Sequence, residues 1–93
     1  MKYTYVEFGD GTIVTFSDIK KDKNGEYIHM YFEKPVPSGF HFLETRLPDL
    51  DMINENGYTS EELNKLLSFA NTNSPLIWEL AREYGGKPIA NAI

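Results

Sequence analysis

The sequence predicts an α+β domain in which a four-stranded antiparallel meander (about residues 2–47) precedes two C-terminal helices (about 60–71 and 75–84) packed on one face of the sheet. Two observations support this. The first half of the chain alternates apolar and polar side chains with a period of two, which is typical of half-buried strands. The last third instead repeats apolar residues every three or four positions behind two cap signals, which is typical of amphipathic helices.

The first two strands form the predicted N-terminal hairpin within residues 2–16, where two runs rich in β-branched and aromatic residues flank a Gly-Asp-Gly segment. Asp-Gly between such runs is a strong hairpin signal, because a type I′ turn needs positive φ at both central residues. We therefore expect Asp10 and Gly11 to be the central turn residues. This register places Tyr5 opposite Phe16.

The third and fourth strands are predicted at 26–33 and 40–47, with proline-containing residues between them that end the first of the pair. Placing the apolar residues of both strands on one face requires an odd sum of paired residue numbers. That register brings four side chains together on the second face: His29, Tyr31, Glu44 and Arg46. The polar connection at 18–25, which includes a short lysine cluster, and residues 48–57 are predicted as loops.

The two helices are predicted from their caps. Thr59 followed by Glu62 forms a capping box, in which the hydroxyl and the carboxylate each accept from the other residue's backbone N–H. The polar run at 71–73 is expected to stop this helix. Ser74 then caps a second helix, with Pro75 at the first helical position, where its missing N–H costs nothing. A Gly-Gly pair ends the second helix.

The C-terminal region contains three motifs that are similar to those of known bacterial proteins. They are Asn-Gly-Tyr-Thr-x-Glu-Glu-Leu, then Phe-Ala-x-x-Asn, then Leu-Ile-Trp-Glu-x-Ala-Arg-x-x-Gly-Gly, with a looser match at residues 31–35. This pattern resembles the C-terminal helices of small uncharacterised bacterial proteins, some of them encoded near toxin–antitoxin or mobile elements. The resemblance implies a bacterial origin and an antitoxin or accessory role. It implies no activity and no catalytic residue.

Composition limits the classes of function. The 93 residues are expected to form a single domain (1–93) with a loosely ordered tail at 87–93. The absence of cysteine excludes disulfides and thiolate metal sites, and it favours a cytosolic location. A formal charge of −5 works against binding to nucleic acid or anionic membranes. No apolar run approaches the ~18 residues of a membrane span.

Candidate chemistry is limited to the second sheet face. His29 is expected beside Glu44, but His41 belongs to the opposite face, so the two histidines cannot share a metal ion. No serine lies in a nucleophile elbow, and the Gly-Asp-Gly turn is not followed by a helix as a phosphate loop requires. We therefore expect no metal, no cofactor and no catalytic residue. A His–Glu cross-strand pair is the expected arrangement.

The expected interaction surface is the sheet face that the helices leave uncovered. It comprises Tyr3, Tyr5, Tyr27, His29, Tyr31, Phe42, Glu44 and Arg46. Five aromatic rings on one face exceed what a monomer usually exposes. We expect a protein–protein interaction module that binds a protein partner or forms a homodimer through this face or through a sheet edge. Trp78 is either a core-rim residue or an interface anchor. The alternative is a small-molecule-binding or hydrolytic domain that uses His29, Tyr31, Glu44 and Arg46.

Overall fold

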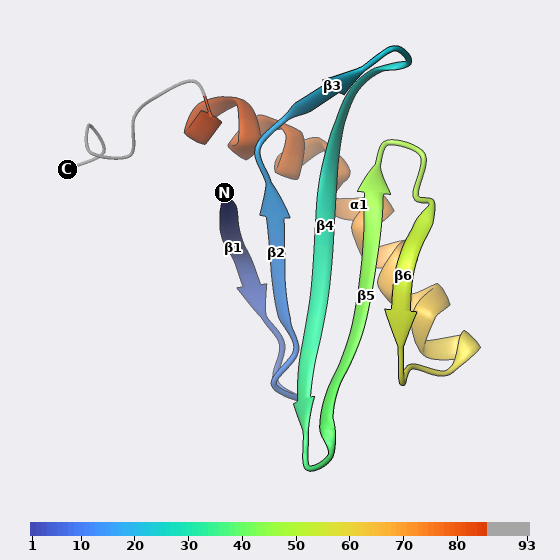
Figure 1. Ribbon diagram of the computed structural model, residues 1–93. Helices are drawn as coiled ribbons and strands as arrows, with labels where there is room; N and C mark the ends of the chain where they lie inside the picture. The colour runs from blue at the N-terminus through green and yellow to red at the C-terminus, as the bar shows by residue number, and fades with distance from the viewer. Residues whose placement is uncertain (86–93) are drawn as a thin grey trace, which may run out of the picture.

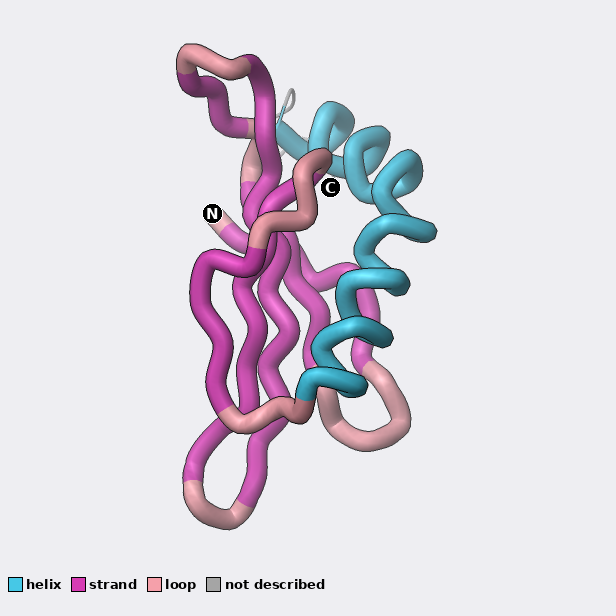
Figure 2. The backbone as a smooth tube through the Cα atoms, turned by 90° about the vertical axis from the view of Figure 1, so that its right-hand side faces the viewer, coloured by secondary structure: helices cyan, strands magenta, loops and turns pink. Residues whose placement is uncertain are grey.

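In the computed structural model, which describes residues 1–85, six antiparallel strands are followed by one long helix (Figure 1). The elements are β1 (Lys2–Glu7), β2 (Ile13–Ser17), β3 (Lys20–Asp22), β4 (Gly25–Val36), β5 (Gly39–Leu47), β6 (Met52–Asn56) and α1 (Ser60–Gly85). The sheet runs in the order β1-β2-β4-β5-β6, and the short β3 pairs with β4. The helix lies along one side of the sheet (Figure 2). The α+β class and the antiparallel sheet are confirmed, whereas the prediction of two helices is wrong.

The helix starts where the capping box places it. The Glu62 N–H donates to Thr59 Oγ1 at 3.1 Å, and the Thr59 N–H donates to Glu62 Oε1 at 2.8 Å. These reciprocal bonds satisfy two backbone N–H groups at the entrance to the helix. The Thr59 hydrogen bond, which is the principal cause, lowers the pKa of the Glu62 carboxyl below its ordinary value. The N-terminal boundary of the helical region is thus set by local sequence.

The predicted stop at residues 71–73 does not interrupt α1. The Asn73 amide donates to the Phe69 carbonyl at 2.9 Å, so its side chain reinforces the helix turn below it. Pro75 lies inside the helix and removes one N–H donor, the partner of the Asn71 carbonyl. Asn71 is exposed, so water can satisfy this carbonyl. The polar run therefore lies on a helix that continues through it.

The apolar stripe explains why one helix replaces two. Its buried residues Leu63, Ala70 and Ile77 are spaced by seven, and Ala81 follows one turn later. Seven residues are close to two helical turns, so the stripes of the two predicted helices are in phase. A single continuous helix buries both stripes against the same sheet face. This packing outweighs the local stop signal.

The hairpin between β1 and β2 exists with a different turn and register. The Gly11 N–H donates to the Phe8 carbonyl at 3.0 Å and the Phe8 N–H to the Thr12 carbonyl at 2.8 Å, so Gly9 and Asp10 are the central residues. Only Gly11 takes a positive φ, of 93°. These bonds are those of a type I turn followed by a left-handed residue. The prediction that Asp10 and Gly11 are the central turn residues is therefore wrong.

An irregularity in β1 fixes the side of the sheet on which its tyrosines lie. Thr4 pairs with Thr15 but Val6 pairs with Val14, so the register shifts by one residue at Tyr5. Tyr3 is thereby opposite the fully buried Phe16, and the Tyr5 hydroxyl donates to Asn73 of α1 at 2.6 Å. Tyr3 and Tyr5 lie on the helix-covered face. Their expected place on the uncovered face is corrected, because a one-residue slip exchanges the two faces of a strand.

The register between β4 and β5 is the predicted one. Paired residues such as Ile28 and Leu47, or Tyr31 and Glu44, have an odd sum of residue numbers. The apolar residues of both strands therefore face α1, and within residues 1–85 they supply five of the eleven buried hydrophobic core residues. The buried members of the core are Val14, Phe16, Ile28, Met30, Phe32, Leu43 and Leu47 from the sheet, and Leu63, Ala70, Ile77 and Ala81 from the helix.

Two predicted loops contain strands. Residues 20–22 form β3, which pairs with the start of β4 in a hairpin closed at Gly25, where φ is 116°. Residues 52–56 form β6, which pairs with β5 and forms one outer edge of the sheet. All five β6 residues are exposed, so no alternation marks this strand in the sequence. The β6 ladder also shifts register, between its pairs to Glu44 and Thr45.

Candidate interaction face

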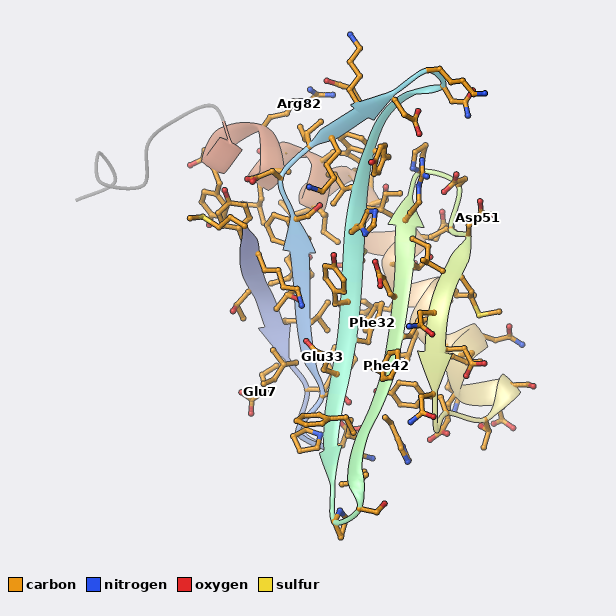
Figure 3. The ribbon with its side chains drawn as sticks, in the orientation of Figure 1. Glu7, Phe32, Glu33, Phe42, Asp51 and Arg82 are labelled. Carbon is orange, nitrogen blue, oxygen red and sulfur yellow. The ribbon has the colours of Figure 1, made fainter. Side chains whose placement is uncertain are left out.

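The sheet side opposite α1, here called the open face, brings together six of the eight predicted interaction residues. They are Tyr27, His29, Tyr31, Phe42, Glu44 and Arg46, all from β4 and β5. Successive side chains of a strand point to opposite faces, so these six point away from α1, whereas the buried residues between them point toward it. Figure 3 looks onto this face, where Glu33 and Phe42 occupy neighbouring strands. The other two predicted residues, Tyr3 and Tyr5, lie on the helix side.

The His29 ring lies at the centre of the open face and contacts the predicted partner. Its Nδ1 atom is 2.7 Å from Glu44 Oε2, and both side chains are about three-quarters buried, with exposed fractions of 21% and 24%. The Tyr31 hydroxyl is 3.3 Å from the same Nδ1 atom. From the other direction, the His29 backbone N–H donates to the Ser17 hydroxyl at 3.0 Å. The imidazole is therefore held in one orientation by its carboxylate neighbour.

Two cationic side chains lie over the aromatic rings of the open face. The Arg46 guanidinium is 4.0 Å from the centroid of the Tyr27 ring, and it also reaches Asp22 at 3.5 Å. The Lys2 ammonium is 4.0 Å from the centroid of the Tyr31 ring. Such contacts stabilise by about 0.5–1 kcal/mol at exposed sites. They also leave both rings only half-exposed, so these tyrosines present less apolar surface than the sequence suggests.

The local electrostatic potential around Tyr31 is negative. Burial is the main reason why the pKa of its hydroxyl is raised above the ordinary value, and the charges of Glu44 and then Glu33 raise it further. Lys2 lies 3.7 Å from Glu33 Oε1 and offsets part of this charge from above the ring. Because the Lys2–Glu33 pair is half-exposed, it contributes little to stability.

One end of the open face is apolar, which was not among the sequence-based expectations. Four side chains lie on neighbouring pair positions around Glu33, and we call them the apolar quartet: Ile13, Pro35, Phe40 and Phe42. Phe40 is 57% exposed and Ile13 is 36% exposed. Within residues 1–85 no element packs over this end of the sheet, which projects toward the β4–β5 turn (Figures 1 and 3).

A shallow depression of about 280 Å³ lies between the apolar quartet and the His29–Glu44 pair. It is lined by Lys2, Tyr31, Glu33, Phe42, Leu43 and Glu44. Glu33 pairs directly with Phe42, and Tyr31 pairs directly with Glu44, so carboxylates and rings alternate across the two strands. The depression therefore combines acidic groups with aromatic walls.

The remaining residues singled out from the sequence lie elsewhere. His41 faces the helix side, where its ring contacts Tyr58 at a centroid distance of 5.5 Å. Trp78 is half-buried against the core from α1, and the Arg82 guanidinium lies 5.4 Å from its ring centroid. Arg82 in turn reaches Glu26 of β4 at 2.9 Å. Neither His41 nor Trp78 belongs to the open face.

The predicted interaction surface did not include Lys2, Glu33, Ile13 and Phe40. The strand alternation already placed Glu33 and Phe40 on this face, so these two could have been included. Ile13 could not, since its side of the sheet depends on the turn that was misassigned. The position of Lys2 depends on which strands flank β4, and Figure 1 shows that β2 lies between β1 and β4.

No group of three or more His, Cys, Asp or Glu side chains within residues 1–85 is arranged to hold a metal ion. Over the same residues, α1 is not apolar enough along its length to cross a bilayer.

Comparison with known proteins adds no family assignment. The chain matches no protein-family model, no curated protein sequence and no solved structure.

Proposed function

We propose that this protein is an interaction module that binds another protein through the open face. The apolar quartet is the observation that carries the proposal. Exposed Phe40 lies two residues from half-buried Phe42 on β5 and pairs with Pro35 of β4, while exposed Ile13 lies on the other side of β4, opposite Glu33. Contiguous apolar surface rimmed by charged residues is typical of protein-binding sites. Lys2, Glu33 and Glu7 supply such a rim.

The charge of the chain favours a basic partner. The formal charge is −5, and the depression beside the quartet contains two carboxylates. Opposite charge on a partner would accelerate encounter and help to fix its orientation. The antitoxin or accessory role implied by the resemblance is one version of such a module. Nucleic acid and anionic membranes are unfavourable partners for the same electrostatic reason.

A comparison of matched surface variants tests the role of the quartet. Phe40→Glu removes the most exposed ring of the quartet, at 57% exposure, while Leu76→Glu alters another exposed apolar residue, on α1, at 46% exposure. We expect affinity for an identified partner to fall at least about tenfold in Phe40→Glu and to stay unchanged in Leu76→Glu. Equal loss in both variants, or in neither, would remove the quartet from the proposed function.

A second copy of the chain is the partner that can be tested without any other molecule. Lys2 pairs with Glu33 and Arg46 pairs with Asp22, so the open face carries cations as well as carboxylates with which a second copy could pair. At a protein concentration of about 100 μM, even a dimer with a dissociation constant of ~10 μM would be mostly assembled, and sedimentation would detect it. If the chain self-associates through the open face, Phe40→Glu or Tyr31→Glu should weaken the dimer without loss of fold. A strictly monomeric wild type would rule out the dimer and leave a different protein as the partner.

The His29–Glu44 pair favours a second candidate function, a small-molecule-binding or hydrolytic domain. A carboxylate that accepts from Nδ1–H leaves Nε2 of the same ring as a base, which is the arrangement of many acid–base sites. Within residues 1–85 the His29 ring makes no hydrogen bond to a serine or threonine hydroxyl, and no group of metal ligands surrounds it, so no nucleophile is paired with it. Turnover of an ester or amide panel that disappears in His29→Ala would establish this function, and no turnover would exclude it for those substrates.

A further inference from the structure

We infer that the depression between β4 and β5 receives a primary ammonium group, the end of a lysine side chain on a basic partner protein. This inference rests on the proposed function and names the group by which the partner is recognised. It adds a polar anchor to the apolar contact that the quartet provides.

The size of the depression suits one side chain. Its volume of about 280 Å³ lies just below the ~300 Å³ at which sites for whole small molecules begin. It is also open to solvent along the sheet surface, so a side chain can enter from a partner that covers the face. A single extended lysine fits these dimensions better than an enclosed metabolite does.

The lining groups are those that recognise an organic cation. Glu33 and Glu44 lie on diagonal pair positions of β4 and β5, which are separated by roughly 7–8 Å, so an ammonium between them can reach both carboxylates. The rings of Tyr31 and Phe42 occupy the other diagonal and present faces that attract cations. Glu44 uses Oε2 for His29, and within residues 1–85 its Oε1 accepts no hydrogen bond.

Lys2 already places an ammonium at the rim of this depression. Its Nζ atom lies 4.0 Å from the Tyr31 ring centroid and 3.7 Å from Glu33 Oε1. The Lys2 side chain is 51% exposed and comes from the first residues of β1, so this contact is easily displaced. The raised pKa of the Tyr31 hydroxyl, to which both glutamates contribute after burial, reflects the same negative potential. Lys2 acts as an internal stand-in for the partner's lysine.

A titration of the full chain followed by amide NMR tests the inference. The probe is the capped peptide Ala-Ala-Lys-Ala-Ala, and its matched control carries Nε-acetyl-lysine at the centre, which has the same backbone and no charge. We expect saturable shifts at Tyr31, Glu33, Phe42 and Glu44 with the first peptide and none with the second. Equal shifts with both peptides, shifts at other residues or no shifts up to about 50 mM would overturn the inference.

Substitutions in the depression test which side chains bind the lysine peptide. Glu33→Gln combined with Glu44→Gln is expected to weaken binding about tenfold or more, because both carboxylates lose their charge. Lys2→Met should tighten binding several-fold by removing the internal competitor. Glu79→Gln, on the exposed side of α1, is the control and should change nothing. Unchanged affinity in Lys2→Met would show that the peptide does not take the position of Lys2.

Two further experiments distinguish a lysine of a partner protein from a free polyamine, and this inference from the proposed function. If free spermidine binds the depression and the lysine peptide does not, the ligand is a free polyamine and the partner-protein source is wrong. The proposed function can fail independently, because the Phe40→Glu comparison tests the apolar quartet and leaves the ammonium site intact. Loss of partner binding in the double glutamine variant, with peptide binding abolished in parallel, is the result expected if both are correct.

Discussion

The Tyr5 hydroxyl of β1 donates to Asn73 Oδ1 in the middle of α1 at 2.6 Å, across 68 positions of sequence. The same Asn73 amide donates to the Phe69 carbonyl at 2.9 Å. The Asn73 side chain therefore joins an outer strand to the helix, and both its amide oxygen and its amide nitrogen have hydrogen-bond partners. A residue type that usually marks the end of a helix here fastens the helix to the sheet.

The first prediction is that this hydrogen bond contributes to the free energy of unfolding. Tyr5→Phe is expected to cost about 0.5–1.5 kcal/mol, because Asn73 Oδ1 loses its donor. Tyr27→Phe is the control, since within residues 1–85 the Tyr27 hydroxyl makes no hydrogen bond. Urea titration of Tyr5→Phe, Asn73→Ala and the double variant gives their coupling, expected at about 0.5 kcal/mol or more. Strict additivity would mean that the two residues do not interact.

The second prediction concerns Gly57, in the turn that leads to the helix. Its φ is 89°, and a Cβ there would lie 2.2 Å from His41 Cδ2. Gly57→Ala is expected to destabilise by about 1–2 kcal/mol from backbone strain alone, with displacement of the imidazole ring adding to this. Gly9→Ala, where no atom lies within 4 Å and φ is not positive, should be neutral or slightly stabilising.

Combining Gly57→Ala with His41→Ala separates the two causes in thermal melts. The double variant should recover the part due to the ring and retain the part due to φ. If Gly57→Ala alone were as stable as Gly9→Ala, the described turn would be incorrect.

The third prediction is an acid-dependent stability effect at Asp18. The Tyr3 hydroxyl donates to its carboxylate, and the N-terminal ammonium lies 3.3 Å away; the first is the larger cause that lowers the pKa of Asp18 below its ordinary 3.8. A lowered folded-state pKa gives stability that is present above the unfolded pKa and is lost as pH falls through the folded pKa. The stability gap between wild type and Asp18→Asn should thus be widest near neutral pH and close below about pH 3.8.

Urea unfolding at a series of pH values measures this gap. Asp49→Asn is the matched control, because exposed Asp49 makes no ion pair within the described residues. A gap that is constant with pH would show that the Asp18 charge has no role. Tyr3 shows the opposite dependence on pH. The hydrogen bond to Asp18 raises the pKa of the Tyr3 hydroxyl above 10.0, so the stability that this bond provides is lost as pH rises through the folded-state pKa.

The fourth prediction ranks the helix cap against the helix core. Thr59→Ala is expected to destabilise by about 1 kcal/mol, because the Glu62 N–H loses its acceptor. Ile77→Ala should cost about 2–5 kcal/mol, since this side chain is fully buried against the sheet. Ser60→Ala, at an exposed neighbouring position without a capping bond, should be near zero. A Ser60→Ala effect as large as that of Thr59→Ala would refute the cap.

Some of the molecule could be predicted because one local signal determined it. The alternation of Ile28, Met30 and Phe32 fixed the β4–β5 register, and that register alone placed His29 beside Glu44. The Thr59–Glu62 spacing fixed the start of the helix in the same way. In each case burial or capping allowed one arrangement, so no other part of the chain had to be known.

Other features depend on interactions between distant segments. The continuous helix required knowing that Leu63 and Ile77 pack on the same sheet face, which outweighs the polar run between them. The faces of Tyr3 and Tyr5 depended on a one-residue register shift that the sequence does not mark. The strand at Met52–Asn56 is held by backbone pairing with β5, so its exposed side chains carry no pattern.

The two outer strands of the sheet share a property that bears on aggregation. The ladders of β1 and β6 each shift register along their length, at Tyr5 and between the β6 pairs to Glu44 and Thr45. A growing fibril needs a long, regular edge on which the next chain can align its backbone groups. Neither end of this sheet offers one. Growth of a filament by the addition of strands to either edge is therefore unfavourable.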